Sequence, residues 1–153
     1  SKVILIAVGG TAMTLLNLKP STIDVDFCTE SKNLEVLRKI IKNDKFKIDL
    51  FQDGYIFSEQ LPEDYIEKSN EVEANLKNIE LKTLSIIDLI ITKIARYNER
   101  DEEDVESIFK THKINRKELE RRFKQIRNTF AGNVNDYNYH FNLIIKRFFK
   151  EAN

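Results

Sequence analysis

The sequence contains few cysteines, prolines and glycines and no tryptophan. Its 153 residues include one cysteine, two prolines and four glycines. A single cysteine, Cys28, excludes an internal disulfide framework. Together with His112 and His140 it is also too sparse for a zinc site. No run of about 18 apolar residues is present, so we expect no membrane span. The first residues are too brief and weakly basic for a signal peptide, which favours a cytoplasmic protein.

The charges balance overall but are unevenly distributed. Lys and Arg together equal Asp and Glu in number, for a formal net charge of zero. Acidic residues outnumber basic ones before residue 110, and basic residues outnumber acidic ones after it. This asymmetry is compatible with an acidic metal site beside a basic surface for a polyanion. It is equally compatible with a helical bundle whose exterior is rich in lysine.

Residues 1–84 carry the patterns of strands and helices in alternation. Runs of β-branched or alternating apolar residues predict strands over 3–8, 22–29, 46–51, 55–58 and 79–84. A short helix is predicted over 11–18 and ends before Pro20, because proline disfavours a helical conformation in the residue ahead of it. Ser31 is the predicted N-cap of a further helix that runs to about Asn43.

Residues 85–153 change to a helical period. Helices are predicted over 86–96, 101–111, from an Asn115 N-cap through Phe130, and over 137–149. We therefore predict an α+β fold. A mixed sheet with flanking helices would occupy residues 1–84, and a helical portion residues 85–153.

Three aspartates are the candidate metal ligands. Because a strand has a period of two, Asp24 and Asp26 leave the same face of the predicted strand, a few ångströms apart. Two like charges so close are costly unless a cation holds them, which predicts Mg²⁺ or Mn²⁺. Asp49 lies on another predicted strand. If that strand is adjacent, two metal ions could bridge a triphosphate and an attacking hydroxyl, and Asp49 could orient or deprotonate the hydroxyl.

The segment Gly9-Gly10-Thr11 supplies a complementary candidate for phosphate binding. Two glycines allow the backbone to approach phosphate oxygens closely, and the helix N-terminus predicted after them favours anions. Thr11 adds a hydroxyl donor. Each motif is weak alone, since glycine often serves turn geometry, but their joint order along the chain is more specific.

In that order the chain resembles the nucleotidyltransferase superfamily, whose fold is shared by DNA polymerase β and kanamycin nucleotidyltransferase. The residues that carry the resemblance are Gly9, Gly10, Thr11, Asp24, Asp26 and Asp49. The resemblance is closest to small prokaryotic AbiEii-type toxin nucleotidyltransferases. It covers roughly residues 3 to 109.

The resemblance also implies nucleotide-binding roles for Lys19 and Thr22, ahead of the aspartate pair, and for Lys93 and Asp101, in the later helices. Two positions depart from the family pattern. Thr11 replaces the commoner serine and keeps the hydroxyl, whereas Lys19 stands where arginine is usual, so a bidentate phosphate contact is lost there.

Lys93 and Asp101 also have structural explanations. A lysine on a helix with an isoleucine face is usually solvated, which leaves a role for Lys93 open. Arg100, Asp101 and Asp104 could serve the electrostatics of a helix start, since acidic residues favour a helix N-terminus. For Asp101 we favour a functional role.

The basic C-terminal portion is a candidate surface for RNA. Its basic residues would suit backbone contacts if gathered on one side: Arg116, Lys117, Arg121, Arg122, Lys124 and Arg127. Phe123 and Phe130 are expected on a buried helix face, His112 and His140 in structural or solvated positions, and Cys28 as a small apolar residue.

The resemblance implies an Mg²⁺-dependent enzyme that moves a nucleoside monophosphate from an NTP onto a hydroxyl of RNA such as tRNA, a protein or a small molecule. It also implies a toxin paired with an antitoxin protein. Two alternatives stay open: a non-catalytic nucleotide-binding or protein-interaction module of the same fold, and a metal-dependent phosphohydrolase that uses the same acids.

Overall fold

The computed structural model of the protein describes residues 2–41 and 47–150. The strands are β1 (Val3–Ala7), β2 (Val25–Thr29), β3 (Ile48–Gln52), β4 (Tyr55–Ile56), β5 (Glu59–Gln60), β6 (Asn70–Glu71) and β7 (Ile79–Thr83). The helices are α1 (Gly9–Leu15), α2 (Ser31–Ile40), α3 (Tyr65–Lys68), α4 (Ile86–Ile91), α5 (Glu99–Thr111), α6 (Arg116–Arg127) and α7 (Val134–Phe148). The predicted α+β class is confirmed.

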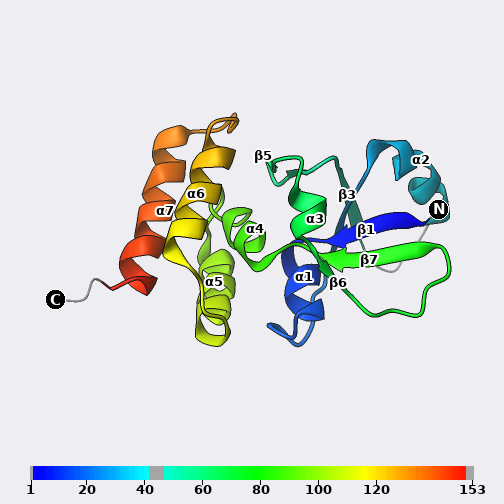
Figure 1. The fold of residues 1–153 in the computed structure, drawn as a ribbon, viewed down its shortest axis with the longest axis horizontal. Coiled ribbons are helices and arrows are strands. Elements are labelled where there is room, and N and C mark those ends of the chain that lie inside the picture. The colour runs from blue at the N-terminus through cyan, green and yellow to red at the C-terminus, as the bar shows by residue number, and fades with distance from the viewer. Residues whose placement is uncertain (1, 42–46, 151–153) are drawn as a thin grey trace.

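The strands form one mixed sheet in the order β5-β4-β3-β2-β1-β7-β6. β1 lies between β2, to which it is antiparallel, and β7, to which it is parallel, while β2 and β3 are parallel. Figure 1 shows the sheet with α1, α2 and α3 at one end of the molecule and α5, α6 and α7 at the other. Helix α4 lies between these two groups.

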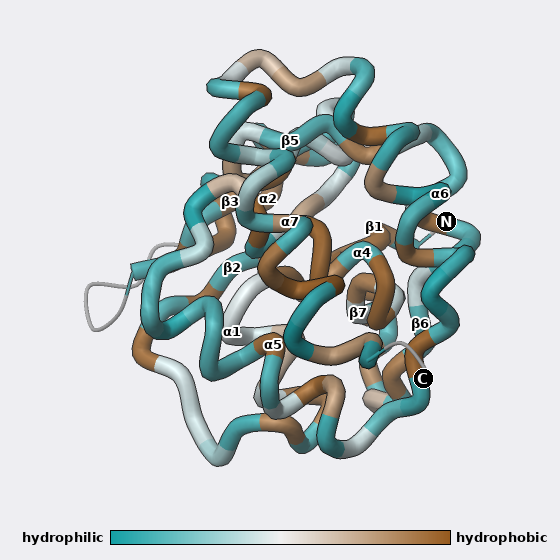
Figure 2. The backbone as a smooth tube through the Cα atoms, turned by 90° about the vertical axis from the view of Figure 1, so that its left-hand side faces the viewer, coloured by the Kyte–Doolittle hydropathy of each residue, from teal (hydrophilic) through white to brown (hydrophobic). Residues whose placement is uncertain are grey.

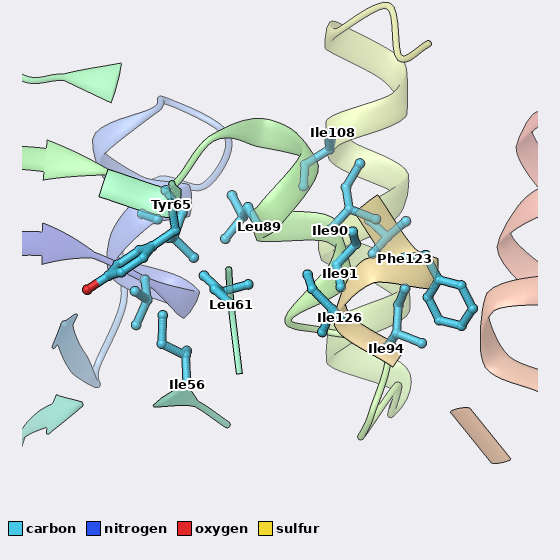
Figure 3. Packing of buried hydrophobic residues seen from close by; sticks show 14 of the residues in the cluster. Ile56, Leu61, Tyr65, Leu89, Ile90, Ile91, Ile94, Ile108, Phe123 and Ile126 are labelled. Carbon is cyan, nitrogen blue, oxygen red and sulfur yellow. The ribbon is translucent and has the colours of Figure 1, made fainter. Parts of the chain in front are cut away.

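Helix α4 is buried because nearly every residue on it is apolar. Leu89, Ile90 and Ile91 are fully buried and belong to one core cluster that reaches both the sheet and the later helices. Figure 3 shows Leu89 between Tyr65 and Leu61 on the sheet side and residues such as Ile90 on the helical side. In Figure 2 hydrophobic segments gather around α4, and most of the outer turns are hydrophilic.

Two N-terminal elements differ from the prediction. The first helix begins at Gly9 and ends at Leu15, instead of spanning 11–18. The strand predicted from residue 22 begins at Val25, because the Thr22 hydroxyl donates a hydrogen bond to the Asp24 carbonyl at 2.9 Å and so holds this segment in a local turn.

The Ser31 cap was predicted wrongly. The N-cap position of α2 is Glu30, without a side-chain cap. The Ser31 backbone N–H instead donates to the carboxylate of Asp53 at 2.9 Å, from the turn between β3 and β4. The helix ends at Ile40, earlier than the predicted end near Asn43. The predicted start of the next strand, at Phe46, falls outside the described residues.

The C-terminal helices end or begin at other residues than predicted, and helix α5, for example, begins at Glu99 instead of Asp101. Helix α4 ends at Ile91, since the next backbone bonds, from Lys93 N–H to Ile90 and from Ile94 N–H to Ile91, have the tighter i to i−3 spacing. Helix α6 is capped by Asn115 as predicted but ends at Arg127. The last helix begins at Val134, capped by the Asn133 side chain.

None of the helices in residues 2–41 and 47–150 combines the length and the apolar character needed to cross a membrane.

Candidate functional site

A polar cleft of about 360 Å³ lies between the sheet and the segment that follows α4. Its lining residues are Gly9, Gly10, Lys19, Thr22, Asp24, Asp26, Lys47, Asp49, Phe57, Lys93, Arg96, Asn98, Arg100, Asp101 and Asp104. We call this the acidic cleft. It contains every site residue predicted from the sequence except Thr11, which lies just behind its wall.

Gly9 and Gly10 form a part of the wall where side chains do not fit. Gly9 has a left-handed backbone (φ +53°), and a Cβ there would lie 3.1 Å from a carboxylate oxygen of Asp26. A Cβ on Gly10 would lie 2.6 Å from the Thr22 hydroxyl. The turn therefore brings backbone close to the aspartates, which only glycine permits.

Thr11 fastens this turn to the aspartate pair. Its hydroxyl is buried, accepts a hydrogen bond from the Asp26 N–H at 2.9 Å and donates to the Asp24 carbonyl at 3.3 Å. We expected the hydroxyl to serve as a phosphate donor. Its two partners show instead that Thr11 positions the backbone that carries both carboxylates.

Asp49 lies directly beside Asp26. The two strands are parallel, and their register pairs Asp26 with Asp49. Asp26 is buried, and burial, followed by the charges of Asp49 and Asp24, raises its pKa to about 6. The neighbouring strand thus brings a second carboxylate against the first, which is a costly arrangement of like charges.

Asp24 is more exposed than Asp26 and is the outermost of the three acids. Among the described residues, no three His, Cys, Asp or Glu side chains are gathered closely enough to hold an ion as they stand. The acidic cleft is therefore a crowded carboxylate pair with a third carboxylate on its rim. The donor set, all carboxylate oxygens, is of the kind that Mg²⁺ and Mn²⁺ prefer.

Two lysines of the acidic cleft share one carboxylate. Lys93 and Lys19 each lie 2.9 Å from a different oxygen of Asp104. Burial alone would raise the pKa of Asp104, but the two lysines outweigh it and lower the pKa. Lys93 is buried, so the solvated alternative for this residue is wrong. Asp104 holds both ammonium groups beside the glycine turn.

Asp101 has a structural partner at each oxygen. Asn98 and Asp101 form a capping box at the start of α5, and Arg96 donates two hydrogen bonds of 2.9 Å to the Asp101 carboxylate. This is the helix-start arrangement that the sequence left open. Through it, Asp101 orients the Arg96 guanidinium, which lies 4.9 Å from the centroid of the Phe57 ring.

The sequence did not single out Phe57 as a site residue. We expected a strand over 55–58, but Phe57 and Ser58 both have left-handed backbones (φ 47° and 71°) and form the turn between β4 and β5. Bulky residues seldom adopt this conformation. The residue types at these two positions therefore do not predict the turn that brings the Phe57 ring into the cleft.

Arg122 was wrongly assigned to an RNA-binding surface. Its guanidinium is buried, donates to both oxygens of Asp88 at 2.7 and 2.9 Å, and donates to Asp64 at 2.8 Å. We call these three residues the Arg122 cluster. It ties α6 to α4 and to the segment before α3, so its positive charge is already matched within the chain.

The other basic residues of α6 are either paired with a neighbouring side chain or exposed. Arg116 pairs with Glu120 at 2.6 Å, and Arg127 donates to the Asn138 side chain at 3.2 Å. The basic residues of α6 that are exposed are Lys117, Arg121 and Lys124.

The remaining predictions concern residues outside the cleft. Phe123 is buried, as expected, whereas Phe130 lies beyond the end of α6 and stacks on Tyr137 with ring centroids 4.1 Å apart. Cys28 is fully buried, as expected. His140 has a structural contact through its Nδ1, 2.7 Å from the Ile94 carbonyl oxygen.

A family described as "Nucleotidyltransferase of unknown function (DUF6036)" matches residues 1–152 of the chain. The comparisons with curated proteins and with solved structures found no match to the chain.

Proposed function

Since the chain belongs to this family of nucleotidyltransferases of unknown function, we propose that it transfers a nucleoside monophosphate from an NTP to a hydroxyl acceptor in the acidic cleft. The observation that carries the proposal is the register of β2 and β3, which sets Asp26 against Asp49 beside the Gly9-Gly10 turn. Carboxylates crowded in this way favour a divalent cation, and the glycine backbone and lysines next to them favour phosphate.

Asp24, Asp26 and Asp49 are the residues that would hold Mg²⁺ or Mn²⁺. When bound, the metal supplies charge neutralisation for the triphosphate and for the attacking oxygen. The fit rests on the register that sets Asp26 beside Asp49. Burial, followed by the charges of Asp49 and Asp24, raises the pKa of Asp26, and a cation would offset the part that is due to these charges. Asp24 joins the other two carboxylates from the rim of the cleft.

In the reaction, the acceptor oxygen forms a bond to the α-phosphorus, and the bond from that phosphorus to the β-phosphate oxygen breaks. Pyrophosphate leaves with the electron pair. Asp49, the half-buried outer member of the carboxylate pair, orients the acceptor hydroxyl and takes its proton. Lys19 and Lys93 stabilise the negative charge of the phosphates, and Asp104 keeps both in position.

RNA is the acceptor class that we favour. The exposed residues Lys117, Arg121 and Lys124 are spaced by four and three positions along α6, so they share one face of that helix. A row of basic side chains suits a phosphate backbone and makes binding sensitive to salt. The toxin role, the antitoxin partner and the special closeness to AbiEii-type enzymes stay predictions from the resemblance.

One observation favours the alternative of a non-catalytic nucleotide-binding module. Asp24 is not gathered with Asp26 and Asp49 into a three-carboxylate cluster within residues 2–41 and 47–150. A module of this kind would bind an NTP without transferring any part of it.

Incubation with total RNA, Mg²⁺ and NTPs labelled at the α- or the γ-phosphate tests the proposal. We expect label from the α-position to enter RNA and label from the γ-position to leave as pyrophosphate. Asp26→Asn should lower the transfer at least about a hundredfold, because a metal contributes several kcal/mol to such reactions. Glu103→Gln, an exposed carboxylate of α5 outside the cleft, is the matched control and should leave transfer unchanged.

Three other outcomes would contradict nucleotidyl transfer in the acidic cleft. Intact NTP binding with no transfer to RNA, protein or small molecules would favour the module. Release of γ-labelled inorganic phosphate would favour a phosphohydrolase. Equal transfer by wild type and Asp26→Asn would show that the reaction occurs elsewhere.

A further inference from the structure

A second hollow, of about 430 Å³, lies next to the acidic cleft. Its walls come from the β4–β5 turn, from the segment after α4 and from the loop before α7: Phe57, Ser58, Ala95, Arg96, Phe130, Gly132 and Asn133. We call it the aromatic hollow. Phe57 and Arg96 line both spaces, so the two are neighbours that share one wall.

The two spaces differ in chemistry. The acidic cleft is walled mainly by aspartates, lysines and arginines. Among the described residues, Arg96 is the only charged one that lines the aromatic hollow, and its guanidinium is already paired with Asp101. The other lining residues include two aromatic rings, Phe57 and Phe130, and the Ala95 methyl. Such a surface favours a flat, uncharged ring over a phosphate.

The rings of the aromatic hollow are held by neighbours. Phe130 stacks on Tyr137 with an interplanar angle of 11°, and Phe57 packs edge-to-face on Phe51 with centroids 4.7 Å apart. The Asn133 side chain caps α7 by accepting a hydrogen bond from Asp136 N–H. These contacts fix the walls in advance, which lowers the entropy lost when a ligand binds.

We infer that the aromatic hollow binds the base of the nucleoside triphosphate whose phosphates lie in the acidic cleft. This inference rests on the proposed function. An NTP is strongly anionic at one end and aromatic at the other, and the two neighbouring spaces offer these environments side by side. Phe57, at the shared wall, lies where the nucleoside passes from one space to the other.

Titration calorimetry with two ligands separates the base from the phosphates. Mg²⁺–ATP carries both parts, whereas Mg²⁺–tripolyphosphate carries only the anionic part. Ala95→Leu places bulk in the hollow, and Phe130→Leu removes a ring from its wall. Tyr139→Leu removes an exposed ring of α7 that does not line the hollow and is the matched control.

We expect Ala95→Leu and Phe130→Leu each to weaken Mg²⁺–ATP binding roughly tenfold, the size of effect that loss of base stacking produces. Binding of Mg²⁺–tripolyphosphate should stay within about twofold of wild type in both variants, since phosphate contacts are untouched. Tyr139→Leu should change neither. One variant adds volume and the other removes it. The same effect in both could therefore not be explained by a packing defect in one of them.

Unchanged ATP affinity in both variants, with intact binding of both ligands by wild type, would overturn this inference and leave the proposed function standing. Equal weakening of ATP and tripolyphosphate would also overturn it, because the substitutions would then act on the acidic cleft. A raised KM for the acceptor with unchanged ATP affinity would assign the hollow to the acceptor instead. If wild type bound neither ligand, the proposed function itself would fail.

Discussion

Two groups of buried charge in this molecule are built in opposite ways. In the Arg122 cluster the guanidinium meets both oxygens of Asp88, which is fully buried. In the acidic cleft Asp26, also buried, faces another carboxylate, and its pKa rises to about 6. In the first group each carboxylate contacts the guanidinium, whereas in the second two carboxylates lie side by side.

The two groups differ in the source of the counter-charge for their buried side chains. A buried charge needs a nearby opposite charge or its pKa shifts until it is neutral. The Arg122 cluster satisfies this rule with residues of α4 and α6, so its role is to hold these helices together. In the acidic cleft the rule is met by the raised pKa of Asp26, and Asp49 lies 3.5 Å from the exposed ammonium group of Lys47. The proposed metal would be a further counter-charge for these two carboxylates.

The largest effect should come from breaking the paired group. Asp88→Ala leaves Arg122 buried without its main counter-charge, and removal of one partner of a buried ion pair costs about 3–5 kcal/mol. Urea unfolding followed by circular dichroism measures this loss. Asp24→Ala, in the acidic cleft, is the control and should be neutral or slightly stabilising, because it removes a repelling charge. Equal destabilisation by the two substitutions would erase the contrast between the groups.

A smaller effect, with a distinctive pH dependence, should follow from Asp26→Asn. The folded-state pKa of Asp26, about 6, lies above its ordinary value of 3.8. The folded protein therefore binds the proton more tightly, and this contribution to stability is present at low pH and lost as the pH rises through about 6.

The asparagine variant lacks this loss. In EDTA, its free energy of unfolding relative to wild type should rise by about 2 kcal/mol between pH 4 and pH 7. Saturating Mg²⁺ should shrink the difference by stabilising wild type alone. A difference that is the same at both pH values would show that Asp26 is not strained by its neighbours.

The smallest effect should come from the exposed member of the Arg122 cluster. The side chain of Asp64 is 43% exposed, against 0% for Asp88. Exposed ion pairs contribute little, so Asp64→Ala should lower the free energy of unfolding by less than about 1 kcal/mol. The comparison with Asp88→Ala, measured in the same urea series, then isolates burial as the cause. A loss as large as that of Asp88→Ala would mean that Asp64 is the main partner of Arg122.

Local patterns predicted most elements of the fold. The alternating pattern indicated β2 and Asp26, although Asp24 precedes the strand, and Asn115 marked the start of α6 because a cap acts within one turn. The cap of α2 could not be predicted in this way. Its partner, Asp53, lies 22 residues further along the chain, and no local pattern reports a contact over that distance.

In the candidate site, too, features set by local sequence could be predicted and features set by distant contacts could not. The order of Gly9, Gly10, Asp24 and Asp26 is visible in the sequence, but the proximity of Asp49 depends on which strands pair and in which register. The prediction for Arg122 was wrong for a related reason, because its partner is distant in the sequence. A basic residue in a basic helix looks solvated until its contact with Asp88, 34 residues away, is known.

That 34-residue separation has a consequence for the protein during its own synthesis. Asp88 stands at the start of the segment that leads to Lys93 and Arg96, two residues of the cleft wall. A nascent chain that has just completed α4 has every strand of the sheet, yet Asp88 still lacks its counter-charge. At about 5–20 residues per second, Arg122 follows on the order of seconds later. The contact that ties α4 to α6 therefore forms only after every strand of the sheet has been made.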